Sequence, residues 1–198
     1  MAFIVLLAGP GLPGEEILYA QGALILKANG ANDEDLAKQR ATQELMFTIL
    51  KQEKDNAVAE KKMREGFDKL MAGATEAEKT RANQTYEAQI KMVLSPWFRN
   101  FLTYDPRPTL ARVKCPVLAL NGENDLQVPV TENLREIEAT LKAAGNKDVT
   151  AMRLPKLNHL FQTSETGSIS EYGKIEETFA PVALKTVGDW ILKHTTSR

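Results

Sequence analysis

The sequence is poor in the residues that hold metals or form disulfides. Among 198 residues it contains one cysteine, Cys115, and two histidines, His159 and His194. One cysteine excludes an internal disulfide and a cysteine-rich metal site, and two histidines are too few for a histidine-rich zinc site. A glycine-rich phosphate-binding loop is also missing. We therefore expect no metal and no cofactor, and we expect Cys115 to be a small buried residue.

An excess of charge of one sign and long hydrophobic runs are missing as well. The 25 basic and 26 acidic residues leave a formal net charge of −1. That balance gives no electrostatic basis for binding nucleic acid or an anionic membrane surface. No apolar run approaches the roughly 18 residues that indicate a membrane span. We therefore expect neither nucleic acid nor a membrane among the partners.

What the sequence does contain is three short apolar runs that predict buried strands. They cover residues 2–8, 116–121 and 149–154. The first is apolar at every position, which is typical of a strand covered on both faces in a parallel sheet. A helical pattern between the second and third runs predicts a right-handed βαβ unit. The expected fold class is α/β, with a short parallel sheet of about three strands and flanking helices.

Amphipathic helical patterns fill the region between the first two strand candidates. One of them opens at Thr75 with a capping box, in which a hydroxyl and a carboxylate satisfy each other's backbone donors. The rigid connector Asp105-Pro106-Arg107-Pro108 follows this region. We divide the chain into a strand and loop at 1–14, a helical cap at 15–105, and the rest of the sheet at 106–198.

Asp125 and His159 are the candidate catalytic residues. Asp125 follows a strand candidate and the turn at Gly122, and His159 lies in the loop after the next strand candidate. The carboxyl ends of parallel strands meet at one edge of a sheet, so we expect the two side chains to meet. An acid and a histidine are two members of a nucleophile–base–acid triad. Taken singly, Asp125 is better explained as a helix cap and His159 as a loop residue without a partner. Their order, spacing and strand-end placement together favour the triad.

The third member of such a triad, a serine on a sharp strand-to-helix turn, is missing. The motif Gly-x-Ser-x-Gly does not occur, and the nearest match, residues 167–171, lacks the closing glycine and a preceding strand. The serines of the chain are Ser95, Ser164, Ser168, Ser170 and Ser197. His194 falls in the last turn of the C-terminal helical pattern, where a cation interacts favourably with the helix dipole.

The run Pro-Val-Leu-Ala-Leu-Asn-Gly-Glu-Asn-Asp ending at Asp125, with Leu-Pro-Lys-Leu-Asn-His ending at His159, resembles the C-terminal half of an α/β-hydrolase. The resemblance is closest to bacterial serine esterases related to dienelactone hydrolase and to prolyl oligopeptidase catalytic domains. Residues 3–11, the helical region and Pro-Trp-Phe-Arg-Asn-Phe-Leu at 96–102 resemble that group's sixth strand, its cap and the approach to its seventh strand.

This resemblance implies a partial α/β-hydrolase fold with a helical cap insertion. Asp125 would orient His159, and His159 would act as the base for a serine that this chain does not contain. The implied substrate is a small-molecule carboxylic ester, with no cofactor. The chain is then expected to be the C-terminal portion of a longer hydrolase, to be inactive alone, and to have the N-terminal half of the same protein as its partner.

Two other functions stay open. A peptidase or amidase would use the same triad, and a non-catalytic module would act by association alone. In the family's sheet order, strands six, seven and eight are neighbours, which would leave residues 3–7, from Phe3 to Leu7, as a bare apolar edge. Bare edges pair with other chains, so we expect self-association as a dimer. The Gly/Pro loop at 9–14 is either part of a ligand site or only a tight turn.

Overall fold

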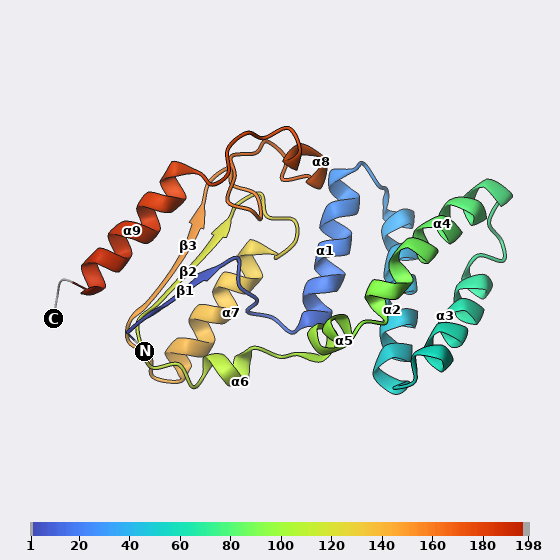
Figure 1. The fold of residues 1–198 in the computed structure, drawn as a ribbon, viewed down its shortest axis with the longest axis horizontal. Coiled ribbons are helices and arrows are strands. Elements are labelled where there is room, and N and C mark those ends of the chain that lie inside the picture. Colours follow the sequence, from blue (N-terminus) through green and yellow to red (C-terminus); the bar gives the residue numbers. More distant parts are fainter. Residues whose placement is uncertain (1, 196–198) are drawn as a thin grey trace. The chain divides into compact units, whose positions relative to one another are not determined.

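The computed structural model describes residues 2–195 (Figure 1). The strands are β1 (Ile4–Leu7), β2 (Val117–Gly122) and β3 (Val149–Leu154). The helices are α1 (Gly14–Ala28), α2 (Asp33–Gln52), α3 (Asn56–Leu70), α4 (Glu76–Val93), α5 (Pro96–Thr103), α6 (Arg107–Leu110), α7 (Val130–Ala143), α8 (Ile169–Tyr172) and α9 (Pro181–Thr195). They form two compact units: a sheet unit, which runs up to Ala31 and resumes at Asp105, and a helical unit, Asn32–Tyr104.

The three strands form one parallel sheet in the order β1-β2-β3. Ile4 pairs with Val117 in the first ladder, and Val117 pairs with Val149 in the second. A small parallel sheet with flanking helices is consistent with the α/β class expected from the apolar runs.

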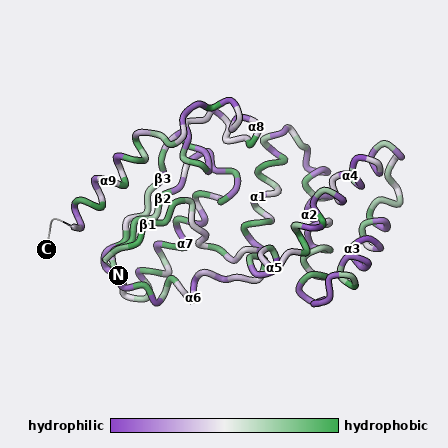
Figure 2. The backbone as a smooth tube through the Cα atoms, in the orientation of Figure 1, coloured by the Kyte–Doolittle hydropathy of each residue, from purple (hydrophilic) through white to green (hydrophobic). Residues whose placement is uncertain are grey.

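The two faces of the sheet carry separate hydrophobic clusters, one under α7 and one under α9 (Figure 1). Val117 and Ala119 of β2 pack with Ile137 of α7, whereas Leu118 and Leu120 belong to the cluster under α9. All four of these β2 residues are at most 1% exposed. A strand buried on both faces needs apolar residues at successive positions, which explains the run Val-Leu-Ala-Leu at the start of β2. Figure 2 shows the hydropathy along the backbone.

β1 is an edge strand. Its ladder to β2 uses the backbone N–H of Ile4, which donates to the Pro116 carbonyl, and continues to Ala8, whose N–H donates to Leu120. Alternate residues of a strand direct their backbone groups to opposite sides, so those of Val5 and Leu7 face away from β2. Within residues 2–195 no strand pairs with this side. The Leu7 side chain is 45% exposed.

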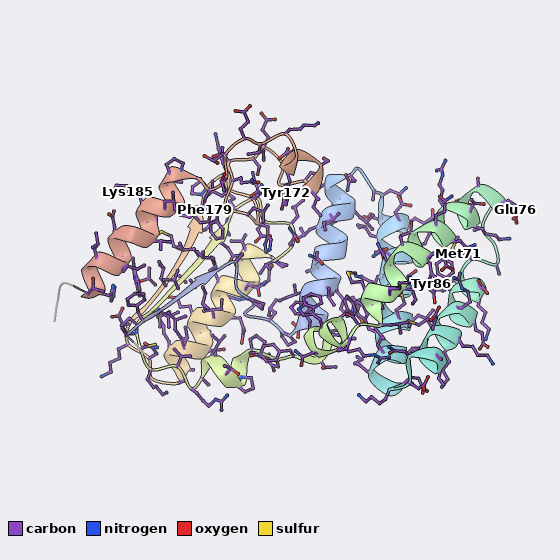
Figure 3. All side chains as sticks on the ribbon, viewed as in Figure 1. Met71, Glu76, Tyr86, Tyr172, Phe179 and Lys185 are labelled. Atoms are coloured by element: carbon purple, nitrogen blue, oxygen red, sulfur yellow. The ribbon has the colours of Figure 1, made fainter. Side chains whose placement is uncertain are left out.

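The helical unit is built from α2, α3, α4 and α5. Asn32 and Thr75 are N-caps with complete capping boxes, which confirms the box predicted at Thr75. Arg99 of α5 donates to the backbone carbonyls of Leu50 and Glu53, both at 2.8 Å. These bonds satisfy carbonyl groups that the end of α2 leaves without helical partners. In Figure 3, the labelled Tyr86 and Met71 belong to this unit.

Two details differ from the expectations drawn from the sequence. Helix α1 belongs to the sheet unit, whereas the cap expected from the sequence begins at residue 15. Cys115 is half-buried rather than fully buried, because it lies in the connection before β2 and not in the strand.

Candidate active site

The site begins at Gly122, the last residue of β2. A Cβ at this position would lie 2.2 Å from the Leu157 carbonyl oxygen and 2.5 Å from that of Asn158. Such distances are far below van der Waals contact, so a side chain does not fit. Glycine is therefore what lets the loop after β3 lie directly against the end of β2. That approach brings the two candidate residues of the sequence together.

His159 lies at the tip of a tight loop after β3. The Asn158 side chain holds the loop from within, because its Oδ1 accepts from the N–H groups of Leu160 and Gln162 at 3.0 and 2.9 Å. Lys156 and Phe161 both have φ of +59°, in the left-handed region that non-glycine residues rarely adopt. Strained backbone of this kind persists only where the surroundings impose it, and it is common at functional sites.

His159 Nδ1 lies 3.0 Å from Oδ2 of Asp125, as their strand-end placement suggested. The Asp125 side chain is completely buried, and the His159 side chain is 27% exposed. The other carboxylate oxygen, Oδ1, accepts from the backbone N–H groups of Gln127 at 2.8 Å and Val128 at 2.9 Å. These donors offset the cost of burying the carboxylate and fix its plane towards the imidazole.

This geometry determines which nitrogen of His159 carries the proton. A carboxylate only accepts hydrogen bonds, so in the neutral ring Nδ1 is the donor and Nε2 holds the lone pair. In the part of the chain that the structure describes, no group hydrogen-bonds to Nε2. The imidazole is thus anchored on one side by an acid and open on the other, which is the arrangement of a general base.

Asn121 is a site residue that the sequence analysis did not single out. It is fully buried in β2, and its Nδ2 lies 3.3 Å from Asp125 Oδ2 and 3.4 Å from the Val128 carbonyl. Its Oδ1 is buried without a hydrogen-bond partner among the described residues. The available signal was one polar residue at the end of an otherwise apolar strand, next to the strand-end acid.

The polar stretch 163–174 is attached to the turn that carries Asp125. Asn124 Nδ2 donates to the carbonyls of Ser164 at 2.9 Å and Glu165 at 3.2 Å. Gly167 has φ of +74°, and a Cβ there would lie 1.8 Å from the Asn124 carbonyl oxygen. Further along, Gln127 Nε2 donates to the Tyr172 hydroxyl at 3.1 Å. Sequence reasoning missed these contacts because loop residues carry no periodic pattern.

None of the serines within residues 2–195 hydrogen-bonds to His159. Ser95 and Ser168 are N-caps of α5 and α8, and Ser168 Oγ lies 2.9 Å from Ser170 Oγ. Ser164 is 7% exposed, and its Oγ is buried with no hydrogen-bond partner in the described part of the chain. Ser197 lies outside the described residues. The structure therefore brings together Asp125 and His159, and no serine of the described part of the chain joins them.

The Gly/Pro loop at 9–14 is fixed to α7. The N–H groups of Gly11 and Leu12 both donate to Asn133 Oδ1, at 2.7 and 3.1 Å. A Cβ on Gly11 would lie 2.4 Å from the Asn133 carbonyl oxygen, so this approach also requires glycine. Asn133 is fully buried. The loop is thus a closely packed turn at the carboxyl end of β1.

His194 is in the last turn of α9, where the sequence placed it. Its Nδ1 lies 2.7 Å from the Trp190 carbonyl oxygen and its Nε2 lies 3.2 Å from Asp148 Oδ2. The ring also stacks on Trp190, with centroids 3.9 Å apart. Both ring nitrogens are therefore engaged, and His194 joins α9 to the start of β3 rather than offering a free base.

The described residues contain no group of three or more histidine, cysteine, aspartate or glutamate side chains placed to hold a metal ion. Likewise, no helix within residues 2–195 is long and apolar enough to cross a membrane. Comparison of the chain with protein-family models, with curated proteins and with solved structures found no match.

Proposed function

We propose that this chain supplies the acid and the base of a Ser-His-Asp hydrolase that cleaves carboxylic esters, and that the serine comes from outside these residues. The observation that supports this most is the 3.0 Å contact between Asp125 Oδ2 and His159 Nδ1, which leaves Nε2 open. A buried, four-fold hydrogen-bonded carboxylate behind an accessible imidazole is costly to build for a purely structural role.

In the proposed reaction, His159 Nε2 takes the proton of a serine hydroxyl as the serine oxygen attacks the ester carbonyl carbon. Asp125 stabilises the imidazolium formed in this step and keeps its ring in place. His159 then returns the proton to the departing alkoxide, leaving an acyl-serine. Water repeats the sequence on the acyl-serine, again with His159 as the base, and releases the acid.

The same proposal extends to the fold. We propose that the sheet unit is the C-terminal part of an α/β-hydrolase core and that the helical unit is its cap insertion. Support comes from the parallel order β1-β2-β3, from helices on both faces, and from an acid after β2 with a histidine after β3. Site placement at the carboxyl ends of the strands is general for open α/β sheets.

Two alternatives remain beside ester hydrolysis. A peptidase or amidase would use Asp125 and His159 in the same way, but its amine leaving group must be protonated as it departs. A non-catalytic module that self-associates is favoured by one observation, the unpaired edge of β1 with its exposed Leu7. The module would need neither side chain of the Asp125–His159 pair.

The proposal is tested by assaying the chain extended by the residues encoded upstream in its reading frame. We expect hydrolysis of short activated esters, slower cleavage of matched anilides, and loss of about 10³-fold or more in kcat for His159→Ala. His194→Ala is the matched control and should keep the rate, since both nitrogens of His194 are engaged elsewhere. Equal rates for His159→Ala and the parent would contradict the proposal.

A further inference from the structure

Gln127 joins two parts of the candidate site. Its backbone N–H donates to Asp125 Oδ1 at 2.8 Å, and its side-chain Nε2 donates to the Tyr172 hydroxyl at 3.1 Å. Tyr172 is the last residue of α8, in the segment between β3 and α9, and is labelled in Figure 3. One residue therefore fixes both the buried carboxylate and a phenol that comes from 45 positions further along the chain.

Groups of the Asp125–His159 pair affect the ionisation of the Tyr172 phenol. Partial burial raises the pKa of Tyr172, and the negative charge of Asp125 adds to that rise. Hydrogen bonding from Gln127 and from the backbone of His159 acts in the opposite direction, by favouring the phenolate. Of these groups, Gln127 is the one whose side chain hydrogen-bonds to the phenol oxygen, at 3.1 Å.

We propose that Tyr172 is a positioning residue for His159. Its hydroxyl oxygen accepts from the Gln127 side chain, and the Gln127 backbone N–H holds the Asp125 carboxylate that orients the imidazole. This inference deepens the proposed function and rests on it for its catalytic meaning. The contacts of Gln127 with Tyr172 and with Asp125 are present in the structure whether or not the site is that of a hydrolase.

The physical need for such a tie follows from the His159 loop. Lys156 and Phe161, on either side of His159, hold left-handed backbone conformations. Such conformations are unfavourable and persist only where the surrounding contacts impose them. The Asp125 contact opposes their relaxation, and Gln127 holds Asp125 in place. Without the phenol oxygen, Gln127 Nε2 loses its acceptor, and the backbone that holds the Asp125 carboxylate is less firmly fixed.

The segment that carries Tyr172 is itself held in place. Asn124 binds two of its carbonyl groups, and Gly167 packs against the Asn124 backbone. At the near end of α8, Thr166 Oγ1 donates to Glu171 Oε1 at 2.6 Å. These contacts fix the segment that carries Tyr172, and a positioning residue requires such support.

The test is proton NMR of the His159 Nδ1–H group in the whole chain. A proton hydrogen-bonded to a buried carboxylate resonates far downfield and exchanges slowly with water. His194→Gln leaves His159 as the single histidine, so the signal is unambiguous. In that background we compare two variants. Tyr172→Phe removes only the phenol oxygen, and Gln127→Met removes the amide group that donates to it.

We expect both variants to lose the downfield signal, or to shift it upfield with faster exchange. Tyr86→Phe removes a phenol oxygen of the helical unit, which bonds to the Glu60 carbonyl at 3.4 Å, and should keep the signal. If Tyr172→Phe fails to fold, Gln127→Met decides. An unchanged signal in the folded variants would overturn the inference and leave the proposed function standing. Absence of the signal in the His194→Gln background itself would overturn both, since the Asp125–His159 bond would not exist in solution.

Discussion

The Leu157 carbonyl oxygen lies 2.2 Å from the place where a Cβ on Gly122 would stand, so the loop of His159 rests on bare backbone at the end of β2. The atoms nearest to that Cβ are all backbone, so no flexible side chain could move aside to admit it. Gly122 therefore determines how closely the loop of His159 approaches the turn of Asp125, although it takes no part in the proposed reaction.

We predict that Gly122→Ala destabilises the chain by about 3 kcal/mol and displaces His159, because overpacking against backbone forces the loop away. Denaturant unfolding measures the stability change. The matched control is Gly173→Ala, where a Cβ would meet nothing within 4 Å. A Gly122→Ala protein as stable as the Gly173→Ala protein would show that this close approach is not present in solution.

We predict that Asn133→Ala lowers the free energy of unfolding by about 1–3 kcal/mol, since the N–H groups of Gly11 and Leu12 lose their common acceptor. Hydrogen exchange at these two amides should accelerate at the same time. Asn100→Ala, at an exposed position of α5, serves as the control and should change stability by less than about 0.5 kcal/mol. Unchanged exchange at Gly11 would contradict the assignment of Asn133 as the anchor of this loop.

We predict that the chain associates through the free edge of β1, around Leu7. Unpaired backbone groups beside exposed apolar side chains are a template for another strand. Sedimentation at high micromolar concentration should show a dimer, and Leu7→Lys should shift it to monomer. Leu70→Lys is the matched control, because Leu70 is similarly exposed at 48% against 45% but lies at the end of a helix. A monomeric parent chain contradicts this prediction.

We predict a pH effect at the alkaline end from Tyr172 and Tyr86. Burial raises the pKa of both phenols above the ordinary value of 10.0. Because the folded state favours the protonated phenol, this contribution to stability is complete below pH 10.0 and is lost as the pH rises through the folded-state pKa. Phenolate absorbance should show that Tyr172→Phe removes a late-titrating group. If Tyr172→Phe instead removes a phenol whose pKa is 10.0 or lower, the hydroxyl of Tyr172 is not buried in solution.

The strands and caps were predictable because they depend on local pattern. An apolar run such as β2 has one stable environment, a strand covered on both faces, and Thr75 followed by Glu78 has an evident role as a capping box. The pairing of Asp125 with His159 was predictable for a topological reason. Parallel strands place their carboxyl ends at the same edge, so residues that follow neighbouring strands meet.

The supporting residues were not predictable, because their partners are set by tertiary contact. Asn133 binds a loop more than a hundred positions away, and Gln127 binds Tyr172 across a polar stretch with no periodicity. His194 was expected only at a helix end, and its contact with Asp148 depends on how α9 lies along β3. Asn and Gln side chains have many possible partners, so their presence in a sequence does not determine which one they bind.

The central claim, that Asp125 and His159 activate a serine from outside this chain, is tested most directly by a fluorophosphonate probe read by intact mass. The probe is applied to this chain and to the chain extended upstream in its reading frame. The account predicts that only the extended chain gains the probe and that His159→Ala, but not His194→Ala, abolishes the gain. Labelling of the present chain by itself would contradict it, because one of its own serines would then be the nucleophile.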